Sequence, residues 1–431
     1  MISTAFINIW NERVGAIVWD GTNGLASLEY EPTFLAKNWD LSPLKMPILG
    51  AEKQIFSFPE LRGTSTFKGL PGLLADVLPD KYGNSLINAW LASHGRPTDS
   101  MNPVELLCFI GQRGMGALEF EPMLPKIYNE TTKIELKGLI QMAEEILLGK
   151  QNFNTNLSSE EAKALSDILK IGTSAGGARA KAVIAFNPIT NEIRSGQAKA
   201  PKGFTQWLIK FDGVTDQQIG TSSGYGRVEM AYYLMANEAS IEMSECRLFE
   251  ENDRAHFMTK RFDREATNEK LHVQSFCAIT HNDFNEITSF SYEQLFETMR
   301  SMLLPYTDAE QLYRRMVFNV MARNCDDHTK NFSFIMDKIG QWKLAPAFDI
   351  CHAYRPGSSW VSQHSLSVNG KRMNITRDDL LQVAHKMNIK KAHLIIDQVR
   401  FAISKWNDFA TQTNVKKELK EAISKTLLYK L

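Results

Sequence analysis

The densest group of chemically useful side chains lies between Asn324 and Asn331, where the chain reads NCDDHTKN. Asp326 and Asn331 are separated by four residues, and Asp349 follows a segment that reads as a short hairpin. Phosphoryl transfer from ATP needs a carboxylate that receives the acceptor hydroxyl, together with an amide and a second carboxylate that hold Mg²⁺ against the phosphates. Protein kinases use the same spacing of these three groups. We therefore interpret Asp326 as catalytic and Asn331 and Asp349 as magnesium ligands.

An ordinary turn is the alternative interpretation of this stretch. Asn324 could cap the preceding helix, and Asp326 or Asp327 could form an Asx-turn. The His-Arg pair that precedes the catalytic Asp of ordinary protein kinases is absent, because Asn324 and Cys325 occupy those positions. We interpret His328 as a hydrogen-bonding residue beside the phosphates rather than as a base. The hairpin and the acid that follows it favour the catalytic interpretation.

A lysine in an apolar strand is the next element that phosphoryl transfer requires. The segment WLIKF places Lys210 among apolar neighbours. Burying an ammonium without a partner is costly, so such a lysine either serves a site or reaches water from an edge strand. Glu229, in the helix predicted next, is a candidate ion-pair partner.

The glycine-rich stretch GTSAGGARAK matches two catalytic motifs incompletely. It fails as a Walker A loop, because Ala178 and Arg179 stand where Lys and Ser or Thr are required. Gly172, Ser174 and Gly176 match the G-x-S-x-G nucleophile elbow, which would indicate a hydrolase. An elbow must pass from a strand into a helix, whereas an alternating strand follows this loop. The elbow is therefore not expected.

A loop that covers phosphates is the interpretation we prefer for the same stretch, with a plain flexible turn as its alternative. The backbone N–H groups of Gly176, Gly177 and Ala178 would face the nucleotide, and Lys181 would add charge. Ser174 would then be exposed enough to accept a phosphate. That phosphate would place negative charge where the phosphates of ATP bind and would close the site by repulsion.

The stretch HFMTKRFDRE is predicted to contain an extended hinge, around Lys260 to Phe262, whose backbone binds adenine. Asp263 would then be able to reach the ribose hydroxyls. An exposed strand end would look the same. The order of these features along the chain favours the nucleotide site, because it is the order found in protein kinases. The features are, in sequence, the glycine loop, the strand lysine, the helix glutamate, the hinge, the catalytic Asp and the metal-binding Asp.

The elements that must position these residues indicate an α+β protein. Alternation of apolar and polar residues predicts an antiparallel meander at the N-terminus. Helical spacing covers residues 137–148 and 158–169, the second with Ser158 as N-cap. A strand is predicted over 204–211, and from about residue 271 the chain is mostly helical. The domains expected are 1–122, a small mixed α/β domain, 123–262, a β-rich lobe, and 263–431, a mostly α-helical lobe.

The composition of the chain argues against several classes of function. The chain of 431 residues carries 49 Lys and Arg against 49 Asp and Glu, so no net charge attracts nucleic acid or an anionic membrane. No apolar run approaches the roughly 18 residues of a membrane helix. The five cysteines form no C-x-x-C pair and indicate neither a disulfide framework nor a zinc site. We expect a soluble, cytoplasmic protein without membrane contact.

In these residues the sequence resembles the HipA family, the serine/threonine-protein kinase toxins of bacterial type II toxin–antitoxin modules. The resemblance covers nearly the whole chain and is most specific in KRFDR and DDHTKN, in that order. Its other segments are WNERVGAIVWD, LLADVLPDKYGNSLI, LLCFIGQRGMGALEF, TSAGGARAKAV, ECRLF, LAPAFDI and SLSVNGK. It implies a two-lobed protein-kinase-like fold with a small additional N-terminal domain, and ATP and Mg²⁺ as cofactors.

The resemblance also implies roles for individual residues and for partners. Asp326 would be catalytic, Asn331 and Asp349 would bind Mg²⁺, and Ser174 would be autophosphorylated. The partners would be a small helix-turn-helix antitoxin resembling HipB, which carries the complex to DNA, and a protein substrate such as an aminoacyl-tRNA synthetase. The residues expected to contact ATP are Gly176, Gly177, Ala178, Arg179, Lys181, Lys210, Lys260, Arg261, Phe262, Asp263, His328, Lys330, Asn331 and Asp349.

Three further hypotheses stay open at this point. A small-molecule kinase would also lack the His-Arg pair. A pseudokinase could act as the co-repressor partner of a DNA-binding antitoxin, although Asp326, Asn331, Asp349 and Lys210 are all intact. A hydrolase that uses Ser174 is the least favoured, because the elbow geometry is not expected there.

Overall fold

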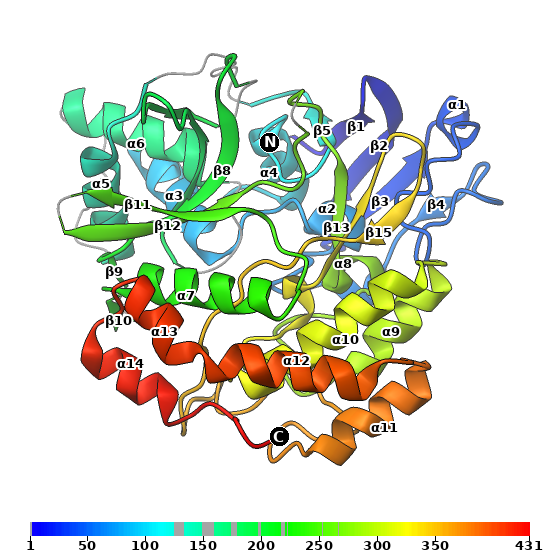
Figure 1. Ribbon diagram of the computed structural model, residues 1–431. Coiled ribbons are helices and arrows are strands. Elements are labelled where there is room, and N and C mark those ends of the chain that lie inside the picture. Colours follow the sequence, from blue (N-terminus) through cyan, green and yellow to red (C-terminus); the bar gives the residue numbers. More distant parts are fainter. Residues whose placement is uncertain are drawn as a thin grey trace. The chain divides into compact units, whose positions relative to one another are not determined.

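The computed structural model groups the chain into two compact units, which are described separately below (Figure 1). Unit 1 comprises Met1–Leu41, Met46–Gly226 and Arg247–Val273, and unit 2 comprises Ser42–Lys45, Arg227–Cys246 and Gln274–Leu431. The residues described are 2–124, 133–148, 159–173, 179–196, 200–216, 220–221, 223–251, 253–265 and 267–431. The predicted three-part division at residues 122 and 262 stays a prediction. Among the helices within these ranges, none is both long and apolar enough for a membrane crossing.

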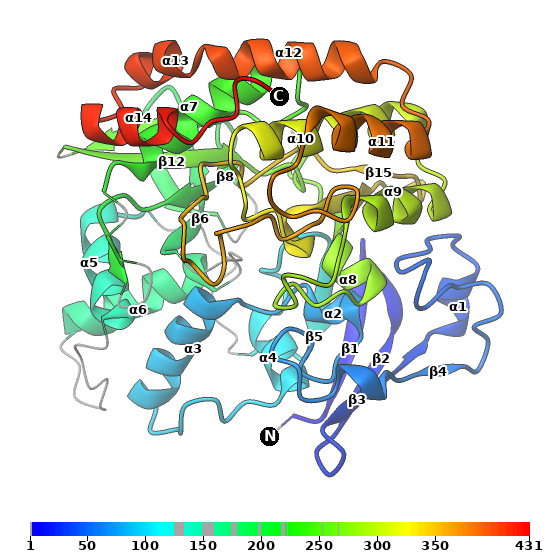
Figure 2. The ribbon, with the colours of Figure 1, turned by 90° about the horizontal axis from the view of Figure 1, so that it is seen from below.

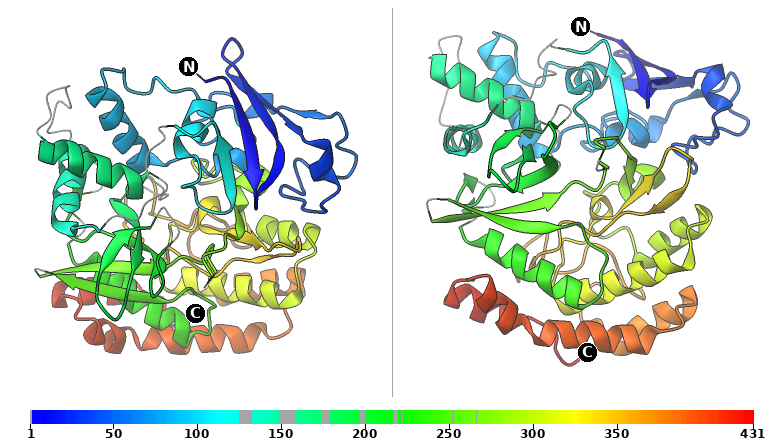
Figure 3. Two further views of the ribbon diagram at one scale, coloured as in Figure 1. Left: turned by 90° about the horizontal axis from the view of Figure 1, so that it is seen from above. Right: turned by 45° about the horizontal axis from the view of Figure 1, so that its top comes forward.

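Unit 1 begins with a five-stranded antiparallel sheet in the order β4-β3-β2-β1-β5. Buried residues alternate along β1, so one face of the sheet packs against α4. This confirms the predicted N-terminal meander, which forms the blue strands in Figure 3. The elements are β1 (Thr4–Ile9), β2 (Glu12–Asp20), β3 (Leu25–Tyr30), α1 (Pro32–Leu35), β4 (Ile55–Phe56), α4 (Pro103–Ile110) and β5 (Leu118–Glu121).

Unit 1 contains further helices, several of which contact one another. The elements are α2 (Gly72–Ala75), α3 (Lys81–Ser93), α5 (Leu136–Leu147) and α6 (Ser159–Gly172). A Cβ atom on Gly172 would lie 2.4 Å from Leu86 Cδ1, so this glycine permits α6 to approach α3. The predicted helices over 137–148 and 158–169 are confirmed by α5 and α6, while Ser158 lies outside the described residues. A helix, α6, precedes the glycine loop, whereas a nucleophile elbow starts from a strand, so the structure agrees with the expectation that no elbow forms here.

A second five-stranded sheet of unit 1, in the order β11-β12-β8-β6-β7, carries the predicted strand lysine at the end of β8. β6 is buried along its whole length, and α6 packs against β6 and β7. The strand predicted over 204–211 is confirmed by β8. The strands are β6 (Lys181–Phe186), β7 (Ile193–Ser195), β8 (Thr205–Lys210), β11 (Cys246–Glu251) and β12 (Arg254–Lys260), with the separate pair β9 (Thr215–Asp216) and β10 (Gly220–Thr221).

Unit 2 is mostly helical, as predicted. α12 lies along α10 in its core, and Figure 2 shows this pair in orange and yellow. Its helices are α7 (Tyr225–Glu238), α8 (Phe276–Thr280), α9 (Tyr292–Ser301), α10 (Tyr306–Met321), α11 (Arg377–Met387), α12 (Ala392–Ser404), α13 (Trp406–Gln412) and α14 (Lys417–Ser424). Its sheet has the order β13 (His272–Ser275), β14 (Ser333–Met336), β15 (Trp342–Leu344).

Local sequence explains why the helices around the site begin where they do. Ser291 and Gln294 form a capping box at the start of α9. Thr376 and Asp379 form the equivalent box at the start of α11. α10 ends at Met321, two residues before Arg323 takes a positive φ of 56°, and this left-handed turn leads the chain into NCDDHTKN.

Candidate functional site

The hairpin β14-β15 brings the two predicted metal ligands to the same end of a sheet. Asn331 closes a 3₁₀ turn, Thr329–Asn331, directly before β14. The antiparallel register pairs Phe334 with Leu344. The start of β14 and the end of β15 therefore lie side by side, and Asn331 and Asp349 line one pocket. The hairpin predicted from the sequence is confirmed.

The two carboxylate oxygens of Asp326 differ in their contacts. Its side chain is 37% exposed. Oδ1 accepts a hydrogen bond from Trp360 Nε1 at 2.7 Å and lies 3.8 Å from His328 Nε2. No residue that the structure describes donates a hydrogen bond to Oδ2. Asp326 can therefore accept a proton or a hydroxyl hydrogen bond at Oδ2 without breaking an existing contact.

The side chain of Asn331 is turned so that its oxygen is available to a cation. Nδ2 donates to the backbone oxygen of Asp326 at 2.6 Å, which leaves Oδ1 as the remaining acceptor of the amide. Asp349 takes a positive φ of 54°, a conformation that costs a non-glycine residue energy and is concentrated at functional sites. One amide oxygen and one carboxylate beside the same pocket are oxygen ligands of the kind that Mg²⁺ prefers.

This donor set suits a metal ion that is shared with phosphates. Mg²⁺ is usually held by one or two carboxylates together with substrate phosphates and water. Within the described ranges, no group of three or more His, Cys, Asp and Glu side chains could hold a metal ion by itself. The residues present therefore fit a magnesium ion that arrives with a nucleotide.

Asp327 is buried, and its hydrogen bonds hold the loop that carries Asp326. Its side chain is fully buried. Oδ1 accepts from the backbone N–H of Ser365, and Oδ2 contacts Tyr292 Oη and His364 Nδ1, each at 2.8 Å. The Tyr292 hydroxyl accepts from Asn319 Nδ2 at 3.0 Å. These contacts fix the backbone on the C-terminal side of Asp326.

The pairing of Asp327 with His364 determines the charge of that histidine. Burial disfavours the charged form of His364, but the adjacent carboxylate outweighs burial and raises the pKa of His364 to about 10. His364 is therefore a buried cation at neutral pH. The sequence analysis missed His364, which lies 37 residues after Asp327 in a stretch without a motif.

Unit 1 places two of the predicted phosphate-binding lysines directly opposite each other. Lys181, at the start of β6, is the cross-strand partner of Lys210, at the end of β8. Lys210 Nζ lies 5.8 Å from the ring centroid of Phe257 on β12. These two positions place two lysines of the predicted phosphate site on adjacent strands. The predicted loop residues Ser174, Gly176, Gly177 and Ala178 lie outside the described residues.

The remaining candidates are divided between the two units. Arg179 stacks over the ring of Tyr225 at 5.1 Å in unit 1. Glu229 is buried in α7, in the part of that helix that belongs to unit 2. Lys330 Nζ lies 5.0 Å from the ring centroid of Phe284 in unit 2. The predicted convergence of the unit 1 lysines with the acids of unit 2 stays a prediction.

The predicted hinge residues lie on β12 and the turn after it. Lys260 pairs with Trp207 across the sheet, and the backbone N–H of Arg261 donates to the carbonyl of Gln206 at 2.9 Å. Phe262 follows and is half-buried. This segment is the extended strand end that the sequence analysis expected. Adenine binding by it stays a prediction.

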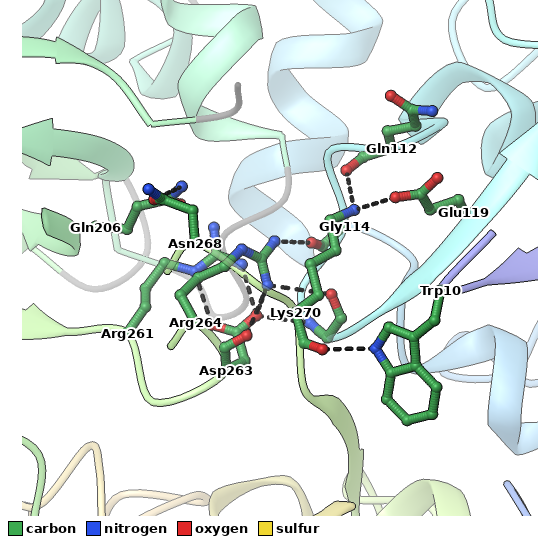
Figure 4. A network of polar contacts seen from close by, with 11 residues as sticks. Trp10, Gln112, Gly114, Glu119, Gln206, Arg261, Asp263, Arg264, Asn268 and Lys270 are labelled. Atoms are coloured by element: carbon green, nitrogen blue, oxygen red, sulfur yellow. Dashed lines mark hydrogen bonds and ion pairs between the residues drawn. The ribbon is translucent and has the colours of Figure 1, made fainter. Parts of the chain in front are cut away.

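Asp263 is the centre of a buried ion cluster (Figure 4). Arg261 donates to both of its oxygens at 2.8 and 2.6 Å, Arg264 donates at 2.6 Å, and the backbone N–H of Gly116 donates at 2.7 Å. Burial alone would raise the pKa of Asp263, but the two guanidinium groups outweigh it and hold the pKa far below its usual value. These contacts occupy the carboxylate that we predicted to reach ribose, and its nucleotide role stays a prediction.

The same cluster joins the first sheet of unit 1 to the turn after β12. Lys270 Nζ donates to the carbonyl of Gln112 and to Glu119, each at 2.8 Å, and Trp10 Nε1 donates to the carbonyl of Lys270 at 2.6 Å. Figure 4 shows these contacts together with Arg264. Lys270, which pairs with Arg264 of KRFDR in an isolated β-bridge, is therefore tied to Glu119 of the N-terminal sheet.

Comparison with known proteins gives matches over both parts of the chain. Residues 5–121 match the family described as HipA N-terminal domain, and residues 173–406 match the HipA-like C-terminal domain. A putative kinase, Y4mE of Sinorhizobium fredii, is 28% identical over 108 residues, which is 23% of this chain and 26% of that protein. The match therefore spans about a quarter of that relative.

The solved structures that match the chain include the following two. HipA in the toxin–antitoxin complex of Shewanella oneidensis, solved with HipB and operator DNA, aligns over 98% of this chain and 94% of its own, with a TM-score of 0.67 and 17% identity. The Helicobacter pylori proinflammatory kinase CtkA aligns over 52% of this chain and 88% of its own, with a TM-score of 0.33 and 12% identity. The first match confirms the predicted α+β, kinase-like fold.

Proposed function

Because the chain belongs to the HipA family, we propose that it is an ATP- and Mg²⁺-dependent serine/threonine protein kinase and the toxin of a bacterial type II toxin–antitoxin system. The observation that carries this proposal is the arrangement around Asp326. Its carboxylate has one open, solvent-exposed oxygen, and the side chains of Asn331 and Asp349 line one pocket beside the same loop.

Each residue of the loop has a distinct task in this proposal. Asp326 receives the acceptor hydroxyl at Oδ2 and orients its oxygen toward the γ-phosphate. Asn331 Oδ1 and the Asp349 carboxylate hold the cation, while the amide Nδ2 keeps Asn331 tied to the backbone of Asp326. A bound Mg²⁺ would neutralise charge on the phosphates. His328 and Lys330 contribute polar and positive groups beside the same loop.

The nucleotide contacts from unit 1 complete the proposal. Lys181 and Lys210 lie at neighbouring strand positions and would supply two positive charges to the phosphates. The loop from Gly176 to Lys181 would cover the nucleotide. The strand end from Lys260 to Phe262 would contact adenine. Glu229 would orient Lys210.

The biological partners follow from the family. The Shewanella relative was solved with HipB and operator DNA, which supports a HipB-like helix-turn-helix antitoxin that mediates DNA contact for this chain. We propose a cytoplasmic protein target such as an aminoacyl-tRNA synthetase, and autophosphorylation at Ser174 as a means of closing the nucleotide site.

The test is transfer of labelled γ-phosphate to proteins of a bacterial lysate. Wild type should label at least one protein, and Asp326→Asn should reduce the rate by about 10²–10⁴-fold, the usual contribution of a positioned acid–base group. Asp408→Asn, an exposed acid on α13, serves as the matched control and should leave the rate unchanged. Absence of transfer by wild type, or equal transfer by Asp326→Asn, would refute the proposal.

A further inference from the structure

Trp360 is the direct neighbour of the catalytic carboxylate. It lies in the segment between Asp349 and α11, and its side chain is half-buried. Its indole Nε1–H donates to Asp326 Oδ1 at 2.7 Å, a short hydrogen bond to a charged acceptor. Nothing in the motif around Asp326 indicates this contact, because the tryptophan follows 34 residues later.

Two further rings hold the indole in place. Trp360 meets His328 at a centroid distance of 6.2 Å and Phe284 at 6.4 Å, both with the rings nearly perpendicular. Phe284 and His328 are 5.3 Å apart, so the three rings form a closed triangle. Edge-to-face contacts at such distances stabilise one relative orientation of aromatic rings. The direction of the indole N–H is therefore set by its neighbours.

The segment that carries Trp360 is fastened to the catalytic loop on both sides of Asp326. On one side, the Cys325 N–H donates to the carbonyl of Ala353, and the Ala353 N–H donates to the carbonyl of Arg323, each at 3.0 Å. On the other side, His364 binds Asp327. The residues between Ala353 and His364 thus form a strap across the catalytic loop, and we call them the strap.

The strap has internal hydrogen bonds that shape the turn around Trp360. The backbone N–H groups of Trp360 and Val361 both donate to Ser358 Oγ at 3.2 Å. The N–H of Arg355 donates to the carbonyl of Val361 at 3.1 Å. The position of Trp360 is therefore fixed by the strap itself, by the aromatic triangle and by the carboxylate.

We propose that Trp360 is a positioning residue for phosphoryl transfer, holding Asp326 by Oδ1 so that Oδ2 faces the acceptor hydroxyl. A carboxylate that is free to rotate presents either oxygen in many directions, whereas one oxygen fixed by an N–H leaves the other in a single direction. In the transfer, the acceptor oxygen forms a bond to the γ-phosphorus, the bond from that phosphorus to ADP breaks, and the hydroxyl proton passes to Oδ2.

This inference rests on the proposed kinase function, and Trp360→Phe tests it. Phenylalanine keeps an aromatic ring in the triangle but removes the N–H donor. We expect kcat to fall by about 10–10²-fold, because small misplacements of a reacting group have effects of that order. The KM for ATP should stay unchanged, since the lost N–H contacts Asp326 alone and phenylalanine keeps a ring against His328. Trp342→Phe, a tryptophan of β15 in the same unit, is the matched control and should keep wild-type kcat.

Two more measurements separate positioning from a structural role. In the Asp326→Asn background, Trp360→Phe should reduce the residual rate no further, because the two side chains act as one unit. The indole N–H resonance of Trp360 should shift in Asp326→Asn, which requires no activity. A wild-type kcat in Trp360→Phe, or additive losses in the double variant, would overturn the inference while leaving the kinase assignment intact. Failure of wild type to transfer phosphate would instead refute the proposed function.

Discussion

Asp326 and Asp327 are adjacent in the chain, but we expect their replacement by Asn to affect different properties. Asp327→Asn should lower the free energy of unfolding, whereas Asp326→Asn should lower the rate of phosphate transfer and leave stability unchanged. Asp327→Asn removes a fully buried charge that contacts Tyr292, His364 and Ser365. It leaves the His364 imidazolium buried without its counter-charge. Breaking a buried ion pair by removing one partner costs about 3–5 kcal/mol. The free energy of unfolding of unit 2 should fall by that amount.

Asp326→Asn is the matched control for this prediction. Its side chain is 37% exposed, and the Asn oxygen can still accept the hydrogen bond from Trp360. Substitutions at such positions change stability by no more than about 0.5 kcal/mol. Urea unfolding followed by tryptophan fluorescence compares the two variants with wild type. Equal stability of both variants would refute the assignment of Asp327 as the buried anchor and Asp326 as the exposed reactive group.

The same pair predicts a pH dependence of stability. The pKa of His364 rises from 6.5 in the unfolded chain to about 10 in the folded protein. The stabilisation by this pair is therefore fully present below pH 6.5 and is lost as the pH rises toward about 10. Unfolding measured between pH 6 and pH 10 should show this loss in wild type and not in Asp327→Asn. An identical pH profile for both would contradict a charged His364.

Three further predictions concern unit 1. Lys210→Met should lower kcat/KM for ATP by about 10²–10³-fold, as expected for loss of a charged group at the phosphates, whereas the exposed Lys202→Met should be neutral in the same kinetic assay. Asp263→Asn should lower the free energy of unfolding by about 3–5 kcal/mol, and because its pKa is depressed, the wild-type stabilisation should disappear as the pH falls below the ordinary value of 3.8. Gly116→Ala should lower the free energy of unfolding by about 1–2 kcal/mol, measured in urea. The reason is that Gly116 has a φ of +75° and that a Cβ would lie 3.1 Å from Val273 N. Unchanged unfolding curves for Asp263→Asn or Gly116→Ala would contradict the structure around the buried cluster.

The sequence was sufficient to predict the hairpin and the proximity of Asn331 and Asp349, the two proposed metal ligands. Asn331, β14, β15 and Asp349 follow one another within 19 residues, so local turn and strand signals determine their arrangement. The fold class was also predictable, because it depends on the periodicity of long segments. Both predictions use information that is local in the chain.

Contacts between distant segments could not be predicted from a single sequence. Trp360 and His364 reach Asp326 and Asp327 across more than 30 residues of chain, and no spacing rule connects them. Asp263 is a second example of a contact that the sequence does not reveal. Its place in KRFDR indicated an exposed acid at a strand end, yet Gly116, 147 residues earlier, donates to it in a buried cluster.

The register of β14 and β15 has a consequence for recognising such proteins. The pairing of Phe334 with Leu344 fixes the distance between the ends of the hairpin, while the turn at Asp337 to Gln341 lies at the opposite end. Residues could be added in pairs at that turn, lengthening both strands, without moving Asn331 relative to Asp349. A pattern search that allows a variable interval between these two positions should therefore find relatives that a fixed interval would overlook.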